Sequence, residues 1–159
     1  MRTLIFLLCL GLIGFYSCKN ETSEKTDLSE ITTVEKPNIQ GVWELVSFYN
    51  YDEEGNVTDT LKASETNKQV KIYTQTRIMW SRFNISDTID WFGYGSYATT
   101  DTSLIETLEY GSKSMNRVIK EEQNVFEFKL EISEDSYSQI TLDDDGDPFF
   151  AENYRRIER

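Results

Sequence analysis

Glu106 is the residue of this sequence whose type and position best suit chemistry in a buried site. It lies in "SLIETLEY", residues 103–110, where Leu104, Leu108 and Tyr110 alternate with more polar neighbours. Successive side chains of a β-strand point to opposite faces, so this alternation predicts that Glu106 faces inward with those residues. A buried carboxylate must be hydrogen-bonded, paired with a cation or protonated. The candidate cation partners are Arg77, Arg82 and Arg156, and the candidate hydroxyl donors are Tyr97, Tyr110 and Tyr154.

The residue types that most catalytic centres need are missing. The chain has no histidine, and its two cysteines are Cys9, inside an apolar leader, and Cys18, directly after that leader. Nucleophilic pairs built on Ser-His or Cys-His are therefore excluded, as are haem sites on histidine and zinc or copper sites on imidazole or thiolate. Carboxylate chemistry remains. A pair such as Glu106 and Glu152 would suit glycoside hydrolysis if the two groups lay within about 10 Å of each other.

The aspartates of the acidic stretch "LDDDGDPFF" raise the question of a calcium-binding loop. Placing Gly146 at the sixth position of an EF-hand loop puts Asp143 and Asp145 at useful positions. Thr141 then occupies the first position, where aspartate is required, and Pro148 interrupts the loop. The Asp-Gly pair favours a tight hairpin turn instead. We therefore predict an acidic turn and no metal site.

The first 17 residues, "MRTLIFLLCLGLIGFYS", have the basic start, apolar run and small final residue of a secretory signal. The apolar run is too short to span a bilayer, which needs about 20 residues. Cys18 follows directly, and "FYSC" resembles the lipobox of bacterial lipoproteins, in which the cysteine carries a diacylglycerol. The resemblance implies lipidation at Cys18, a membrane partner through that anchor, and a place in the bacterial cell envelope, at the outer membrane. The alternative is an ordinary cleavage site beside a stray thiol.

Residues 18–38 contain no aromatic residue and many Glu, Ser, Thr and Lys. Such a composition cannot bury enough apolar surface to fold, so it predicts a disordered tether before one domain at 39–159. The whole chain carries a formal net charge of −12 at pH 7. A phosphate backbone would be repelled by this charge, so we expect no nucleic-acid partner.

The sequence of the domain predicts a series of short β-strands. "VFEFKLEIS", residues 125–133, alternates apolar and charged residues, which is typical of a half-buried strand. Only residues 61–68 suggest a short helix. Gly93 and Gly95 are expected where a strand bends or another group approaches closely, and residues 99–102 are expected to form a turn. The other β-rich runs are 42–51, 70–73, 78–83, 88–99, 104–110, 137–142 and 149–157.

This pattern predicts an all-β fold, a single antiparallel up-and-down β-barrel of about eight to ten strands, in which closure removes exposed edges. "GVW", from Gly41 to Trp43, resembles the GxW signature of the lipocalin and calycin group, and "ENYRRIE" supplies Arg156 near the end of the chain. In that group an arginine from the last strand packs on the tryptophan at the barrel floor. The blocks "KIYTQTRIMW" and "GYGSYATTDTSLIETLEY" extend the resemblance to the lipocalin-like domains of bacterial envelope lipoproteins.

The resemblance implies a non-enzymatic barrel without a cofactor that binds a small hydrophobic or amphipathic ligand. Two alternatives stay open: an interaction or scaffold module that acts through its acidic surface, and a carboxylate-based hydrolase. A ligand site predicts a cavity of about 300 Å³ or more, whereas a scaffold predicts an interior filled by side chains. The candidate ligand-binding residues are Trp80, Tyr94, Tyr97, Glu106, Tyr110, Tyr154 and Arg156.

Overall fold

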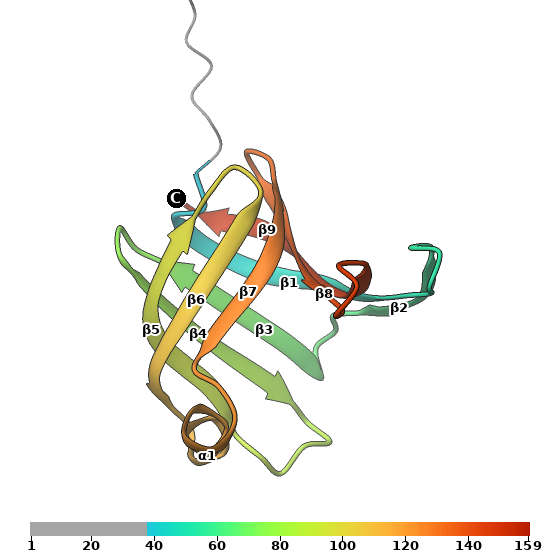
Figure 1. Cartoon of the computed structure of the whole chain (residues 1–159). Coiled ribbons are helices and arrows are strands. Elements are labelled where there is room, and N and C mark those ends of the chain that lie inside the picture. The colour runs from blue at the N-terminus through green and yellow to red at the C-terminus, as the bar shows by residue number, and fades with distance from the viewer. Residues whose placement is uncertain (1–37) are drawn as a thin grey trace, which may run out of the picture. The chain divides into compact units, whose positions relative to one another are not determined.

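A computed structural model describes residues 38–159 of the chain, and Figure 1 shows them as a closed β-barrel. Eight antiparallel strands form a ring, which is closed by pairing between β9 and β1. The remaining strand, β2, pairs with β1 outside the ring. This confirms the predicted all-β fold with a single antiparallel barrel. The strands are β1 Gly41–Tyr51, β2 Val57–Lys62, β3 Asn67–Tyr73, β4 Arg77–Asn84, β5 Trp91–Thr99, β6 Ser103–Gly111, β7 Val125–Ile132, β8 Ser136–Leu142 and β9 Pro148–Glu158.

The first strand, β1, pairs with two other strands along one of its edges. Its first half, from Gly41 to Glu44, pairs with β3, and its second half, from Ser47 to Tyr51, pairs with β2. Its other edge pairs with β9 along most of its length, with a register shift between Leu45 and Ser47. A shift of this kind bends a strand and increases its twist. β1 can therefore close the ring with one half and project away with β2 in the other, as Figure 1 shows.

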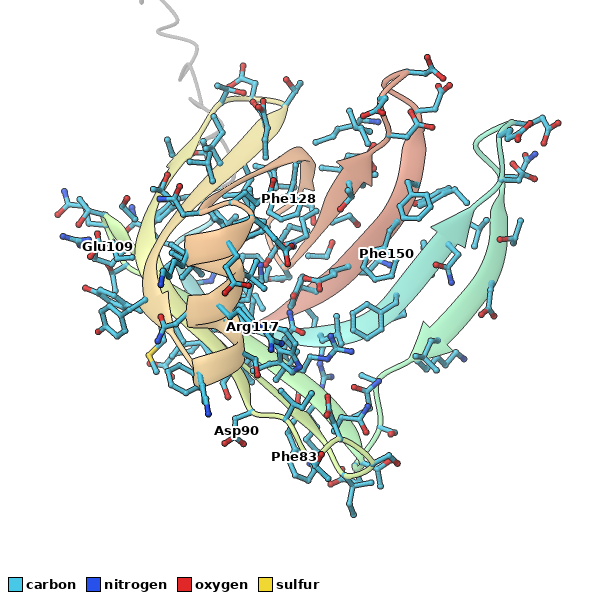
Figure 2. All side chains as sticks on the ribbon, turned by 60° about the horizontal axis from the view of Figure 1, so that its bottom comes forward. Phe83, Asp90, Glu109, Arg117, Phe128 and Phe150 are labelled. Carbon is cyan, nitrogen blue, oxygen red and sulfur yellow. The ribbon has the colours of Figure 1, made fainter. Side chains whose placement is uncertain are left out.

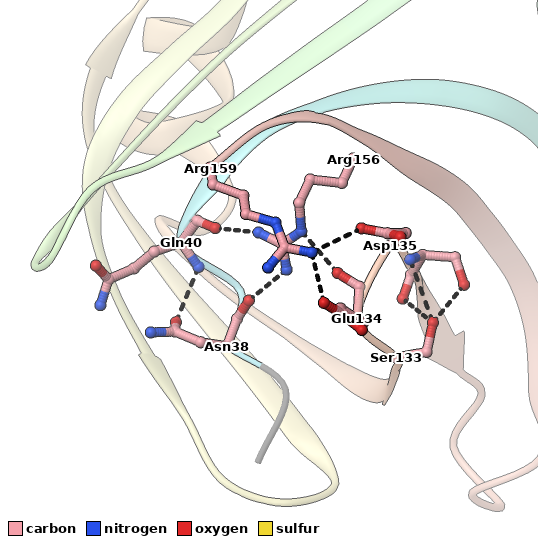
Figure 3. A network of polar contacts seen from close by, with 8 residues as sticks. Asn38, Gln40, Ser133, Glu134, Asp135, Arg156 and Arg159 are labelled. Carbon is pink, nitrogen blue, oxygen red and sulfur yellow. Dashed lines mark hydrogen bonds and ion pairs between the residues drawn. The ribbon is translucent and has the colours of Figure 1, made fainter. Parts of the chain in front are cut away.

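One end of the barrel is closed by Trp43 and Arg156. The indole of Trp43 is fully buried, and its Nε1 donates to the carbonyl of Ile39 at 2.6 Å. The guanidinium of Arg156 lies 4.0 Å from the centroid of the Trp43 ring, within range of a cation–π contact. Arg156 also donates to the backbone carbonyls of Asn38, Gln40 and Glu134 (Figure 3). It therefore links the last strand of the domain to the segment at its N-terminus.

Gly41 is required at this closed end. Its φ of +124° is a backbone conformation that residues with a Cβ rarely adopt. A Cβ at this position would also lie 2.4 Å from the carbonyl oxygen of Glu158 and 2.9 Å from Nη1 of Arg156. The structure therefore brings all three residues of the GxW-and-arginine signature into one closely packed cluster.

The helix expected at residues 61–68 is wrong. Leu61 lies in β2 with an exposed side chain, and the backbone of Ser64 pairs with that of Asn67 in a tight turn into β3. Only Ala63 of this segment packs against the core, which is too little apolar surface to support a helix, so the chain forms a tight turn between two paired strands. The described residues form a helix elsewhere, α1 at Lys113–Glu121, which the sequence analysis missed.

Helix α1 has signals that were available in the sequence. The hydroxyl of Ser112 accepts a hydrogen bond from the backbone N–H of Met115, the standard role of an N-cap serine. Met115, Val118 and Ile119 follow at helical spacing, and all three pack against the barrel core. The run is short and highly charged, so its three apolar residues were not recognised as one face.

Both expected turns are confirmed. Between β5 and β6 the N–H of Thr100 donates to the carbonyl of Ser103 at 2.9 Å. Between β8 and β9 the carboxylate of Asp143 accepts from the backbone N–H groups of Asp145 and Asp147, and Gly146 has a φ of +90°. The acidic stretch is therefore a self-capped hairpin turn.

Candidate functional site

The barrel contains a cavity of about 230 Å³ at the end where α1 lies. It is smaller than the 300 Å³ that the sequence analysis set for a ligand site. Figure 2 looks toward this end and labels Phe128 and Phe150, which belong to the cavity wall. The lining residues come from β3 to β9 and from α1: Gln69, Lys71, Trp80, Arg82, Trp91, Glu106, Leu108, Met115, Phe126, Phe128, Gln139, Thr141, Phe150 and Glu152.

The cavity walls are largely aromatic, with partly buried rings of Trp80, Trp91, Phe126, Phe128 and Phe150. Gly93 makes room for one of these rings, because a Cβ there would lie 2.7 Å from Nε1 of Trp80. A Cβ at Gly95 would lie 2.0 Å from the carbonyl oxygen of Thr107 on the neighbouring strand. Both glycines therefore mark close approaches, as the sequence predicts.

Lys71, Glu106, Gln139 and Glu152 form the inner end of the cavity. They belong to a buried polar network centred on Lys71. The Nζ of Lys71 lies 2.9 Å from Oε1 of Glu106 and 2.7 Å from Oε1 of Gln139, and it donates to both. The hydroxyl of Tyr73 donates to the same Oε1 of Glu106 at 2.5 Å. The Lys71 and Glu106 side chains are almost completely buried. Burial, with the charge of Glu106 as a second cause, holds the pKa of Tyr73 well above 10.

A second carboxylate belongs to this network. Oε2 of Glu152 accepts from the hydroxyl of Tyr154 at 2.6 Å and from the amide of Gln69 at 3.2 Å. The same oxygen lies 3.9 Å from Nζ of Lys71, which is close enough for an ion pair but too far for a hydrogen bond. Burial, with the charge of Glu152 as a second cause, raises the pKa of Tyr154 well above 10. Glu106 and Glu152 therefore share one ammonium group.

Each carboxylate keeps one oxygen without a partner. Within residues 38–159, hydrogen bonds reach Oε1 of Glu106 and Oε2 of Glu152. No hydrogen bond from those residues reaches Oε2 of Glu106 or Oε1 of Glu152. Both residues line the cavity, and Glu106 is only 3% exposed to solvent. The inner end of the cavity therefore presents two unpaired carboxylate oxygens to whatever occupies it.

The inward position of Glu106 is as predicted, but the expected partners are wrong. Arg77 pairs with Glu109 on the outer surface, and Arg156 lies over Trp43 at the closed end. Arg82 lines the cavity at an exposed position, with its guanidinium 5.7 Å from the centroid of the Phe48 ring. Tyr97 donates to the backbone carbonyl of Thr74.

Lys71 and Tyr73 were missed because β3 reverses the usual pattern. Its buried side chains are Gln69, Lys71 and Tyr73, whereas Val70 and Ile72 lie on the other face. The rule that the more apolar face points inward therefore fails for this strand. The period-two alternation was visible in "NKQVKIY", and treating its polar face as the inner one would have identified Lys71.

The expectation that Tyr110 points inward is also wrong. Tyr94 pairs with Tyr110, whereas the next residue, Gly95, pairs with Leu108, so Glu109 is an extra residue in β6. This bulge reverses the alternation, and Tyr110 is 53% exposed. Its ring lies 5.1 Å from that of Tyr94, outside the set of residues that line the cavity.

Of the seven candidate ligand-binding residues, the structure places two in the cavity lining, Trp80 and Glu106. Tyr154 is fully buried in the adjoining network, and the ring of Tyr97 packs 5.0 Å from that of Tyr73. Arg156 lies at the closed end. Trp91 and the phenylalanines of the wall were missed, although Phe126 and Phe128 stand on the inward face of a strand that alternates clearly.

Two further sequence expectations concern membrane attachment. The predicted signal, Cys18 and all of the predicted tether except Asn38 lie outside the described residues. Among the residues that the structure describes, no helix is long and apolar enough to cross a membrane.

Comparison with known proteins gives two similar solved structures. One is an uncharacterized protein from Bacteroides eggerthii DSM 20697, with 17% identity and a TM-score of 0.47 over 75% of this chain and 99% of that one. The other is a lipocalin-like protein from Bacteroides uniformis ATCC 8492, with 14% identity and a TM-score of 0.48 over 74% and 97% of the two chains. No protein-family model matches the sequence, and no curated protein is significantly similar. The activity must therefore be inferred from the residues of this barrel.

Proposed function

We propose that this protein is a lipid-anchored lipoprotein of the bacterial cell envelope, held at the outer membrane, that binds a small amphipathic ligand inside a lipocalin-like barrel. The observation that supports binding is the cavity itself, because it combines aromatic walls with unpaired carboxylate oxygens at its inner end. Small-molecule sites characteristically join an apolar lining to a few convergent polar groups. Its volume of about 230 Å³ suits a ligand smaller than a typical drug molecule.

The scaffold alternative is less well supported. A barrel that served only as a scaffold would gain stability from a filled interior, since a cavity forfeits packing contacts. This barrel instead leaves space beside Glu106, and the walls of that space come from six strands besides β6 and from α1. The acidic surface still favours solubility, but it supplies no site of comparable definition.

The hydrolase alternative meets its distance condition and fails on arrangement. Glu106 and Glu152 both lie within 3.9 Å of Nζ of Lys71, so the two carboxyl groups are within about 10 Å of each other. A glycosidase, however, needs the scissile bond between its two carboxyl groups. Here both carboxylates are instead ion-paired with one ammonium group, that of Lys71, at 2.9 Å and 3.9 Å.

The position of the cavity is compatible with an anchor at Cys18. The described chain begins at Asn38, whose carbonyl accepts from Arg156 at the closed end of the barrel. Figure 1 shows this start and α1 at opposite ends of the domain. The mouth of the cavity therefore lies at the end of the domain opposite Asn38, the first described residue.

Native mass spectrometry of the protein purified from its own membrane tests the binding proposal. We expect a bound small molecule that is lost in Glu106→Ala and in Glu152→Ala. Glu109→Ala is the matched control, because Glu109 lies on the same strand as Glu106 but pairs with Arg77 outside the barrel. A folded wild-type protein that carries no small molecule would contradict the proposal.

The anchor is tested separately. Cys18→Ser should release the domain from the membrane into the soluble fraction, since the Cys18 thiol is the proposed attachment point for the acyl chains. Fractionation of cells that express the variant and the wild type would measure this. Continued tight membrane attachment of the variant would refute lipidation at Cys18.

A further inference from the structure

We infer that the inner end of the cavity binds an ammonium group, and that the ligand is therefore a small amphipathic amine. This inference rests on the proposed ligand-binding function and specifies the chemistry of the ligand. The inner end holds two carboxylates, Glu106 and Glu152, against one ammonium, that of Lys71. These three side chains therefore carry one more negative than positive formal charge, and Glu152, whose side chain is 16% exposed, has only the longer ion pair, at 3.9 Å.

The hydrogen bonds leave several acceptor atoms of the cavity lining without a donor. Lys71 is within hydrogen-bond distance of Glu106 but 3.9 Å from Glu152. Oε2 of Glu106 and Oε1 of Glu152 accept no hydrogen bond from the described residues, and both side chains line the cavity. The side-chain oxygen of Gln69, also in the lining, likewise accepts none from them. All three free atoms are acceptors, so the site is complementary to a group that carries several N–H donors.

Lys71 shows how this environment holds an ammonium group. Its Nζ binds carboxylate and amide oxygens and also lies 5.7 Å from the centroid of the Phe128 ring and 5.8 Å from that of Tyr154. These distances are within the range of cation–π attraction. The cavity lining therefore contains both kinds of group that hold an ammonium here, carboxylates and aromatic rings. The body of the ligand would then lie against the remaining aromatic wall.

Arg82 is the other cation in the lining, and it does not neutralise the inner carboxylates. It forms no ion pair within residues 38–159, its side chain is exposed, and its guanidinium lies over Phe48. Arg82 lies opposite Trp91, the first residue of β5. It is therefore two residues closer to the β4–β5 loop than Trp80 is. Solvent screens a charge in this position much more than one at the buried end. The formal net charge of −12 further favours the approach of a cation over an anion.

Three probes of nearly the same shape test the inference: tryptamine, its neutral alcohol analogue tryptophol, and the anionic indole-3-propionate. Binding would be measured by isothermal titration calorimetry on the full chain carrying Cys18→Ser, which avoids detergent. We expect tryptamine to bind at least about tenfold more tightly than tryptophol, because charge-assisted hydrogen bonds are the stronger ones. Indole-3-propionate should bind more weakly than either.

Substitutions of the two carboxylates test whether they cause the preference for tryptamine over tryptophol. Glu152→Gln should weaken tryptamine binding about tenfold and leave tryptophol binding within about threefold. Glu106→Gln should act in the same direction, with circular dichroism used to check the fold, and Glu152→Gln keeps the test usable if that variant does not fold. Glu109→Gln removes the same charge outside the barrel and should change nothing.

The outcomes separate this inference from the proposed function. Equal or tighter binding of tryptophol or indole-3-propionate would overturn the amine inference, while showing that the cavity does bind small molecules. Absence of tryptamine binding would also overturn it, and the co-purification experiment would still decide whether the barrel carries another ligand.

Discussion

Lys71 on β3 and Glu106 on β6 form a buried ion pair, with 2.9 Å between Nζ and Oε1. Each is also hydrogen-bonded to a third buried side chain, Lys71 to Gln139 and Glu106 to Tyr73. Such a pair does not necessarily add net stability, because both charges have left water. It does fix the relative positions of strands on opposite parts of the ring, and with them the shape of the inner end of the cavity.

Removing one partner of this pair should be strongly destabilising. We expect Lys71→Met to lower the free energy of unfolding by about 3 to 5 kcal/mol, since it leaves the Glu106 carboxylate buried without its cation. Urea denaturation would measure the change. Arg77→Met breaks the exposed pair with Glu109 and should lower it by less than about 1 kcal/mol. Equal effects of the two substitutions would contradict the buried network.

The hydroxyl groups of the buried tyrosines should contribute unequally to the stability of the fold. Tyr73→Phe removes a hydrogen bond to Glu106 and should destabilise the fold by about 1 to 3 kcal/mol. The hydroxyl of Tyr137 is buried without a hydrogen-bond partner in the described chain, so Tyr137→Phe should change the stability by less than about 0.5 kcal/mol or increase it. Thermal unfolding of both variants would test this, and a larger loss for Tyr137→Phe would reverse the assignment.

Alkaline conditions should unfold the barrel before they ionise its inner tyrosines. Burial raises the pKa of Tyr73, Tyr137 and Tyr154 well above 10 in the folded state. Below pH 10 these groups are protonated in both states, so their contribution is fully present. Above pH 10 the unfolded chain loses their protons first, and stability falls by up to about 1.4 kcal/mol per pH unit for each tyrosine.

Spectrophotometric titration of tyrosinate would show this as ionisation of the three groups only on unfolding, at a pH above 10. Urea unfolding between pH 8 and 11 would give the accompanying loss of stability. If stability instead stayed constant or rose above pH 10, these tyrosines would not be buried as described.

Arg156→Lys should be far from conservative at the closed end. Lysine lacks the planar guanidinium that lies 4.0 Å from the Trp43 ring and donates to three backbone carbonyls. We expect a loss of about 2 to 4 kcal/mol in the free energy of unfolding, measured by chemical denaturation. Arg155→Lys is the matched control, because Arg155 is exposed and pairs with Glu44 on the surface. It should cost less than about 1 kcal/mol.

Helix α1 depends on its N-cap. Ser112→Ala removes the acceptor for the N–H of Met115 and should lower the stability of the domain by about 1 kcal/mol. Because Met115 lines the cavity, the same variant should also alter access to it. Amide hydrogen exchange would detect faster opening of the helix, and Ser112→Asp, which also caps well, should restore protection.

The alternating strands made the barrel predictable from the sequence. In "VFEFKLEIS" the apolar residues stand at every second position, so the inner face of β7 followed directly from the geometry of a strand. Glu106 was placed correctly for the same reason. Where a bulge interrupts the alternation, at Glu109, the prediction for Tyr110 failed, because one extra residue exchanges the two faces of a strand.

By itself, the sequence determined an all-β barrel, the absence of histidine and thiol chemistry in its domain, and the closed-end residues Gly41, Trp43 and Arg156. These features depend on local periodicity or on single residue types. Only the tertiary structure decided that Lys71 meets Glu106 and Glu152, because the three residues lie on strands far apart in the chain that closure of the ring brings together. It also decided that space remains beside them, since a cavity depends on how all the side chains of the interior pack at once.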